Sequence, residues 1–242
     1  MRAKLVISYD GSRFNGFARQ KNDYLAKTVS NTLDEILHNI GIFSKVVGAG
    51  RTDAGVHAIR QCVAFDIPEY WTDEKKLERE ISRKLPNSIQ IRSCKIVSND
   101  FHPRFGVKKR AYRYLISTGK PNPFDAPYVT FTEVIDFASV QKAVLMLNGE
   151  FDFSFFKKTG GNEKTLTRTI RTNCYKKNDL IVFYFESNGF LRSQIRMLMH
   201  FILEIANGTL SEVDFIEQLK CEKKHTSKLA SPNGLYLVKV AY

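Results

Sequence analysis

Short apolar segments with the spacing of half-buried strands punctuate the first hundred residues, at 4–9, near 43–47, at 61–67 and at 89–97. Residues 28–40 instead carry apolar side chains at helical spacing, with Thr28 as N-cap and Gly41 as stop. The helical positions are Val29, Leu33, Ile36, Leu37 and Ile40. A second helical stripe of Leu77, Ile81 and Leu85 ends at Pro86. This half therefore predicts the order β-α-β-β-α-β.

The second half repeats that order. Strands are predicted at 112–117, 169–175, 180–186 and 235–241, and helices at 137–147, 190–206 and 212–220. Asp136 and Ser211 are the predicted N-caps, and Asn148-Gly149 and Asn207-Gly208 are the stops. Each half matches a ferredoxin-like unit. We expect an α+β fold of two such halves, 1–104 and 105–242, that form one extended mixed or antiparallel sheet with a central cleft.

A glycine-rich loop separates two strands of the first half. It reads Gly48-Ala49-Gly50-Arg51-Thr52-Asp53-Ala54-Gly55-Val56-His57-Ala58. A dinucleotide fingerprint needs a third glycine at position 53 and a helix afterwards, whereas this chain has Asp53 and then strand-like alternation. The loop is therefore a strand–loop–strand connection. Asp53 either accepts hydrogen bonds from its own loop or performs chemistry, and the local residues leave both possibilities open.

The predicted helix at 190–206 is apolar around much of its circumference, which predicts extensive burial. Arg192 and Arg196 interrupt this surface, and a half-buried guanidinium requires an anion. We hypothesise that Arg196 pairs with Asp53, which keeps the carboxylate charged and oriented as a nucleophile. The alternative is that Arg196 extends along the helix surface to water.

The charge distribution favours a polyanionic partner. The formal net charge is +12, and residues 104–120 carry six basic side chains without an acidic one. Residues 157–177 carry seven basic side chains and only Glu163 as an acid. Aromatic residues lie among these bases, which favours nucleic acid over a membrane surface, although a basic surface can also serve solubility alone.

Other classes of protein fit the sequence poorly. No apolar run approaches the roughly 20 residues that span a bilayer, and the N-terminus does not resemble a signal peptide. The four cysteines occur singly, without zinc-ligand spacing, as expected for reduced thiols in the cytoplasm. We therefore expect a cytoplasmic protein with no metal site.

Gly50-Arg51-Thr52-Asp53-Ala54-Gly55-Val56-His57-Ala58 resembles the signature loop of the TruA-type tRNA pseudouridine synthases. Further motifs of that family follow in order along nearly the whole chain. They are Tyr9-Asp10-Gly11, Leu85-Pro86-Asn87, Phe101-His102-Pro103-Arg104-Phe105, Arg110-Ala111-Tyr112-Arg113-Tyr114, Phe151-Asp152-Phe153-Ser154-Phe155, Thr167-Arg168-Thr169-Ile170, Phe190-Leu191 with Arg196, and Gly234-Leu235-Tyr236-Leu237. The departures from the family pattern, such as Phe17, Ala18, Arg60 and Arg192, avoid the residues assigned to the chemistry.

The resemblance implies the pseudouridine synthase fold and isomerisation of uridine to pseudouridine at positions 38–40, in the tRNA anticodon stem-loop. It implies a homodimer that uses no cofactor and no metal. Asp53 is then the nucleophile, Arg196 its partner, Tyr112 the residue stacking on the base, and Arg51 the residue that assists base flipping. The remaining residues expected to contact substrate or RNA are Arg104, Lys108, Lys109, Arg110, Tyr114, Arg192 and His57.

Two other functions were weighed against this one. An RNA-binding protein of the same fold without catalysis has no use for Asp53, Tyr112 and Arg196 together. A hydrolase with Asp53 as base needs a histidine partner, and the five histidines show no paired spacing. Both are therefore less well supported than the synthase.

Overall fold

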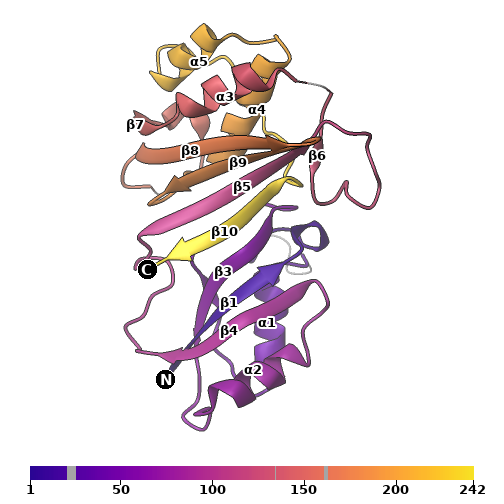
Figure 1. The fold of residues 1–242 in the computed structure, drawn as a ribbon. Coiled ribbons are helices and arrows are strands. Elements are labelled where there is room, and N and C mark those ends of the chain that lie inside the picture. The colour runs from indigo at the N-terminus through magenta and orange to yellow at the C-terminus, as the bar shows by residue number, and fades with distance from the viewer. Residues whose placement is uncertain (21–25, 134, 161–162) are drawn as a thin grey trace. The chain divides into compact units, whose positions relative to one another are not determined.

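The computed structural model describes residues 1–20, 26–133, 135–160 and 163–242. Its described part contains ten strands and five α-helices, which confirms the α+β class (Figure 1). The chain divides into two compact units. The first comprises Met1–Lys108 and Tyr236–Tyr242, and the second comprises Lys109–Leu235.

The first unit is a sheet with helices on one face. Its strands are β1 (Arg2–Tyr9), β2 (Val47–Gly48), β3 (His57–Asp66), β4 (Ile89–Val97) and β10 (Leu235–Ala241). The order is β4-β1-β3-β10, with β2 paired to β3; β10 runs parallel to β3, whereas the other pairs are antiparallel. The helices are α1 (Val29–His38) and α2 (Glu74–Ser82), and α2 packs on β4.

Alternation along β1 explains which face the helices cover. Ala3, Leu5, Ile7 and Tyr9 are buried, and the residues between them are partly exposed. The apolar stripe of α1 is likewise buried, and the Thr28 hydroxyl accepts a hydrogen bond from the backbone N–H of Asn31 (3.1 Å). The predicted N-cap is therefore confirmed.

The strands of the second unit follow the order β5-β9-β8-β7, with β6 paired to β5. Its elements are β5 (Lys109–Ser117), β6 (Thr130–Phe131), α3 (Phe137–Leu145), β7 (Gly149–Asp152), β8 (Thr167–Lys177), β9 (Leu180–Ser187), α4 (Gln194–Ala206) and α5 (Glu212–Leu219). The helix α3 packs on α4 and β8. Four buried rings, Phe153, Phe156, Phe201 and Phe215, contact one another in this core.

Three boundaries differ from the sequence-based expectation. β3 begins at His57 and not at residue 61, so the glycine-rich loop is shorter than predicted. The predicted helix at 190–206 begins only at Gln194, because Ser193 has a left-handed backbone (φ 58°) that a helix cannot contain. Arg192 therefore precedes the helix, and its predicted place on the helix surface is wrong. The last strand, counted above with the second half, contributes Tyr236–Tyr242 to the first unit.

Candidate active site

Asp53 lies in the loop of residues 49–56 that joins β2 to β3, as the strand–loop–strand prediction requires. The N-terminal end of the loop is held by two hydrogen bonds to β3. The Ala49 N–H donates to the carbonyl of Cys62 (2.8 Å), and the Gln61 side-chain amide donates to the carbonyl of Gly50 (2.9 Å). Asp53 is partly buried in this loop.

A tight turn follows Asp53. Its carbonyl accepts the N–H of Val56 (3.2 Å), and Gly55 within the turn has φ 79°. A side chain at that position is strained in this conformation, which explains the glycine. The backbone therefore reverses immediately after the carboxylate and returns into β3.

Residues 9–17, from the end of β1 onward, contact the loop and support it. The Tyr9 hydroxyl hydrogen-bonds the buried Thr52 hydroxyl (2.7 Å), and the Phe17 N–H donates to the carbonyl of Thr52 (3.1 Å). A Cβ on Gly11 lies 2.1 Å from the carbonyl oxygen of Val56, so only glycine allows this approach. Gly16, at φ 94°, approaches the carbonyl of Thr52. The segment of residues 9–17, which is far from the loop in sequence, thus fixes the backbone around Asp53.

His57 has a structural position. It is only 2% exposed, and its Nδ1 accepts a hydrogen bond from the N–H of Gly11 (3.0 Å). The Asp10 carboxylate lies 3.4 Å from the same nitrogen, and the ring stacks on Tyr236 of β10 at 4.6 Å. The expected contact of His57 with RNA is therefore unsupported, because the ring is enclosed. It joins the loop to β10.

In the second unit, Tyr112 and Arg196 occupy separate elements. Tyr112, on β5, is 8% exposed and meets Phe190 edge-on at 5.3 Å. Arg196, in the first turn of α4, donates from Nε to the carbonyl of Ala230 (2.9 Å), and the Ala230 N–H donates back to the Arg196 carbonyl (2.9 Å). Asp53 and Arg196 belong to different units, and their ion pair stays a prediction.

Tyr114 is fully buried, so the expected contact with RNA is unsupported. Its hydroxyl donates to the carbonyl of Ser231 (2.8 Å) and also contacts the Thr130 hydroxyl (2.8 Å). Burial raises the pKa of Tyr114 to about 12, against the opposing effects of the Thr130 hydrogen bond and the Arg196 charge. Tyr114 supports the segment that also binds Arg196.

The predicted basic contacts differ in how far they are engaged within the protein. Lys109 forms an ion pair with the largely buried Glu186 (3.0 Å), and Arg110 donates to the carbonyl of Asn188 (2.8 Å). Arg192 donates to the carbonyl of Thr159 (2.9 Å). Arg51, Arg104 and Lys108 are exposed. In the second basic segment, Lys157 pairs with Glu163 (2.7 Å), which lowers the pKa of that carboxyl.

One basic groove was missed by the sequence analysis. Lys4, Arg60 and Lys95 line a groove of about 270 Å³ on the sheet of the first unit, together with Val6, Cys62, Ser93, Val240 and Tyr242. Lys4 and Lys95 are directly opposite in the pairing of β1 with β4, an arrangement of like charges that is unfavourable without an anion. Glu74 pairs with Lys95 (3.1 Å), and Lys4 lies over the ring of Tyr242. The alternation of buried and partly exposed residues along β1 could have revealed this groove, because it places Lys4 on the face of the sheet away from the core.

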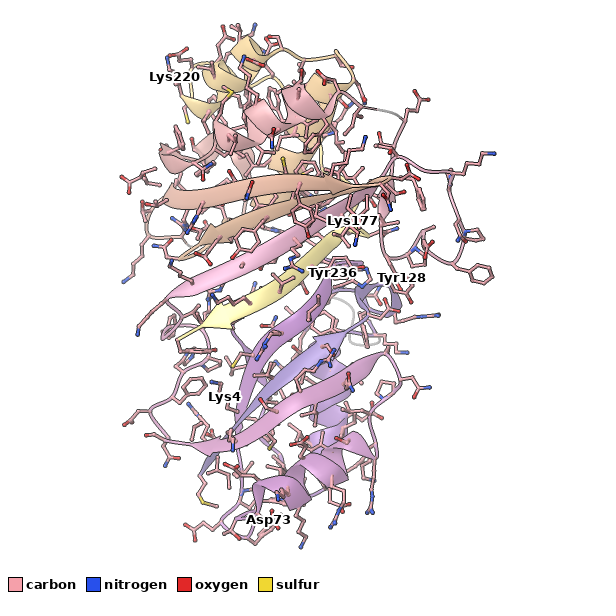
Figure 2. All side chains as sticks on the ribbon, in the orientation of Figure 1. Lys4, Asp73, Tyr128, Lys177, Lys220 and Tyr236 are labelled. Atoms are coloured by element: carbon pink, nitrogen blue, oxygen red, sulfur yellow. The ribbon has the colours of Figure 1, made fainter. Side chains whose placement is uncertain are left out.

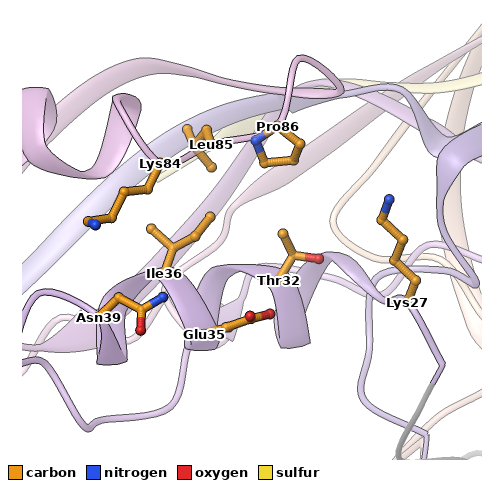
Figure 3. Close-up of a pocket in the computed structure, with 8 residues that line it drawn as sticks. All are labelled: Lys27, Thr32, Glu35, Ile36, Asn39, Lys84, Leu85 and Pro86. Atoms are coloured by element: carbon orange, nitrogen blue, oxygen red, sulfur yellow. The ribbon is translucent and has the colours of Figure 1, made fainter.

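A larger groove of about 610 Å³ lies beside α1 and contains none of the predicted site residues. Figure 3 shows its lining: Lys27, Thr32, Glu35, Ile36, Asn39, Lys84, Leu85 and Pro86. The predicted motif Leu85-Pro86-Asn87 borders it. Mixed charges and its open form make it a poor fit to an anion-binding site.

The cysteines and metal-ligand residues add no reactive centre. All four cysteines are free thiols, and burial raises the pKa of Cys94 to about 12 and that of Cys174 to about 11. Among the described residues, one group of possible metal ligands occurs at Asp214, Glu217 and His225. The two ring nitrogens of His225 lie 3.3 Å from the Asp214 carboxylate and 2.7 Å from the Glu217 carboxylate, so these side chains already bind one another.

In the described part of the chain, no helix has both the length and the apolar character needed to cross a bilayer.

Comparisons with known proteins identify the family. A family model described as tRNA pseudouridine synthase matches residues 5–106 and 143–242. The chain is 40% identical to tRNA pseudouridine synthase A of Helicobacter hepaticus, over 99% of this chain and 98% of that protein. Identity is 37% to the protein of that name from Campylobacter jejuni, over 100% of both chains, and 40% to the one from Wolinella succinogenes, over 98% of this chain and 92% of that protein. The chain therefore belongs to the tRNA pseudouridine synthases, a family of isomerases.

Proposed function

We propose that this protein isomerises uridine to pseudouridine in the anticodon stem-loop of tRNA, at positions 38–40. The observation that carries the proposal is the loop between β2 and β3, whose backbone is fixed by Gly11, Thr52 and His57 around a partly buried Asp53. Such a support holds a reactive carboxylate in one orientation, as catalysis requires. The match to the synthase family over nearly the whole chain supports the reaction assigned to that carboxylate.

The reaction breaks the bond between N1 of uracil and C1′ of the ribose and forms a bond between C5 and C1′. A proton leaves C5 and N1 gains one, so atoms and electrons balance without a redox cofactor or a metal. Asp53 is the proposed nucleophile, and the Arg196 guanidinium is its proposed ion-pair partner, which keeps the carboxylate charged. The anchorage of Arg196 to Ala230 supports a fixed position for that guanidinium.

The remaining proposed roles concern the position of the nucleotide. A stacked base hides N1 and C5, so the uridine must leave the stack, and exposed Arg51 is proposed to fill the vacated space. Tyr112 is proposed to stack on the detached base. Arg104 and Lys108 are proposed to bind phosphate because both side chains are exposed. A homodimer in the cytoplasm is proposed as the functional form.

The test compares the wild type with Asp53→Asn and with the matched control Asp100→Asn, an exposed aspartate of the same unit. Each is incubated with unmodified tRNA transcripts, and pseudouridine is mapped site by site by carbodiimide modification and primer extension. We expect product at positions 38–40 with the wild type and with Asp100→Asn, and none with Asp53→Asn, while all three bind tRNA equally.

Two outcomes contradict the proposal. Equal product from Asp53→Asn excludes its carboxylate from the chemistry. Tight tRNA binding by a wild-type protein that yields no pseudouridine supports the alternative, a non-catalytic RNA-binding protein of this fold.

A further inference from the structure

The loop of residues 118–129, between β5 and β6, presents an aromatic side chain to solvent. Phe124 is 83% exposed, the highest value among the exposed large apolar side chains of the described residues. The loop also lies outside the two segments that match the synthase family model. None of the roles proposed above uses it.

Hydrogen bonds within the loop define its backbone conformation on both sides of Phe124. The carbonyl of Asn122 accepts the N–H groups of Asp125 (3.1 Å) and Ala126 (2.8 Å), and its side-chain oxygen accepts the N–H of Phe124 (2.9 Å). The carbonyl of Asp125 accepts the N–H of Tyr128 (2.8 Å). Prolines at positions 121, 123 and 127 restrict the backbone further.

The loop is attached to the same short segment that binds Arg196. Asn233 donates from its side chain to the carbonyl of Ala126 (2.8 Å), and Arg196 donates to the carbonyl of Ala230 (2.9 Å). Residues 230 and 233 are at most about 11 Å apart in a fully extended chain. Buried Tyr114 holds the middle of the segment through Ser231 (2.8 Å). All these residues belong to the second unit, and the segment of residues 230–233 thus connects the loop to the proposed partner of the nucleophile.

The base of the loop lies against the turn between β8 and β9, next to basic residues. The Thr118 N–H donates to the carbonyl of Asp179 in this turn (2.9 Å). The end of β8 that leads into the turn carries exposed Lys176 and Lys177, of which Lys177 is labelled in Figure 2. Lys120 in the loop is exposed as well. The acids present are Asp179 and Asp125, and the Asp125 carboxylate accepts a hydrogen bond from the Asn122 side chain. Basic groups next to an exposed ring suit a nucleic acid better than a purely apolar partner.

We propose that Phe124 is a stacking platform for an unpaired base of the tRNA substrate, near the uridine that reacts. This proposal rests on the proposed function, because it takes tRNA as the ligand. Every nucleobase has a face that can stack on an aromatic ring, so the contact adds affinity without strict dependence on sequence. The exposed lysines at the end of β8 then bind the adjoining RNA backbone, and Tyr128, which is 40% exposed and is labelled in Figure 2, extends the apolar surface.

The test measures tRNA affinity, KM and kcat for the wild type, Phe124→Ala, Phe124→Trp and the control Phe43→Ala. Phe43 is a second highly exposed phenylalanine (74%) and lies in the first unit. Loss of one stacked base weakens binding about 5- to 150-fold. We expect that weakening in Kd and KM for Phe124→Ala, with kcat and the melting temperature unchanged, recovery in Phe124→Trp, and no change in Phe43→Ala.

A second measurement identifies the stacked base. Abasic nucleotides are introduced one at a time through the anticodon loop, and each RNA is bound to the wild type and to Phe124→Ala. At the stacked position the abasic RNA weakens binding to the wild type and causes no further loss in Phe124→Ala. Additive losses at every position overturn the proposal.

The remaining outcomes separate this proposal from the others. Equal affinity of Phe124→Ala and Phe43→Ala for tRNA overturns it while leaving the synthase reaction intact. If the wild type forms no pseudouridine but Phe124→Ala still loses affinity, the proposed reaction fails and the stacking contact stands. Dissociation of a dimer by Phe124→Ala, measured by analytical ultracentrifugation, assigns Phe124 to a protein interface and overturns it.

Discussion

At the scale of single residues, the loop around Asp53 depends on one close backbone approach. Gly11 lies so near Val56 that no side chain fits between them, and the Gly11 N–H donates to the buried His57 ring. These two contacts hold the far side of the turn that carries Asp53. A catalytic carboxylate displaced by about 1 Å can lose about a hundredfold in rate. Gly11 thus acts on the chemistry through the backbone position of the loop.

We therefore predict that Gly11→Ala lowers the rate of pseudouridine formation at least about a hundredfold. The new Cβ lies 2.1 Å from the carbonyl oxygen of Val56, so the loop must move. The control is Gly106→Ala, whose Cβ has its nearest neighbours at 3.6 Å and fits without displacement. Single-turnover rates and thermal unfolding are measured for both. A Gly11→Ala enzyme of normal rate shows that the loop tolerates the movement.

Residue types predicted the strand–loop–strand connection around Asp53 better than they predicted which side chains are buried. The glycines and Asp53 could be interpreted from sequence because a turn followed by a strand leaves little choice of backbone. His57 and Tyr114 were expected to contact substrate or RNA, whereas the structure buries both side chains. His57 is covered by Tyr236, and Tyr114 reaches Thr130 and Ser231. Those partners are distant in sequence, so no local pattern reveals them.

At the scale of elements, N-cap residues correctly predicted where some helices begin, whereas the start of α4 depends on a backbone conformation that the sequence does not signal. Thr28, Asp136 and Ser211 were predicted as N-caps, and each accepts a hydrogen bond from the following turn. The start of α4 was predicted too early because the apolar stripe continues through Leu191. Ser193 is left-handed and its side chain makes no capping hydrogen bond, so the helix begins without the usual signal.

The cap of α1 gives a prediction at this scale. Thr28→Ala removes the oxygen that accepts the Asn31 N–H, and we expect a loss of about 1 kcal/mol in unfolding free energy beyond the loss of the buried methyl group. Thr28→Ser loses the methyl and keeps the oxygen, so comparing the two variants isolates the cap. That difference corresponds to about 2–4 °C in melting temperature for a chain of this size. Equal stability of the two variants contradicts the assigned cap.

At the scale of the whole molecule, the end of the chain completes the unit in which it began. β10 pairs in parallel with β3, where Tyr236 is opposite His57 and Leu237 is opposite Ala58 (Figure 1). The Asp53 loop is therefore supported by residues from both ends of the sequence. The repeated order of elements predicted two halves, but it could not reveal this exchange, because the order of elements along the chain does not specify which strands pair.

The net charge of +12 raises the question of whether tRNA binding uses the whole surface or particular grooves. Each phosphate contact changes the slope of log Kd against log salt concentration by about 0.7 for single strands and about 0.9 for duplexes. Arg60 is exposed and lines the basic groove of the first unit, whereas Lys75 is exposed on α2. Arg60→Ala and Lys75→Ala remove the same charge from different places.

We predict that Arg60→Ala weakens tRNA binding and lowers the salt slope by about 0.7 to 0.9, because one phosphate contact is lost. Lys75→Ala keeps the wild-type slope, since a charge outside the groove releases no counterion on binding. Arg60→Lys retains most of the slope because the positive charge remains. The measurement is Kd by filter binding between about 50 and 200 mM salt. If both alanine variants lower affinity equally without a change of slope, tRNA responds to the total charge and the groove binds no phosphate.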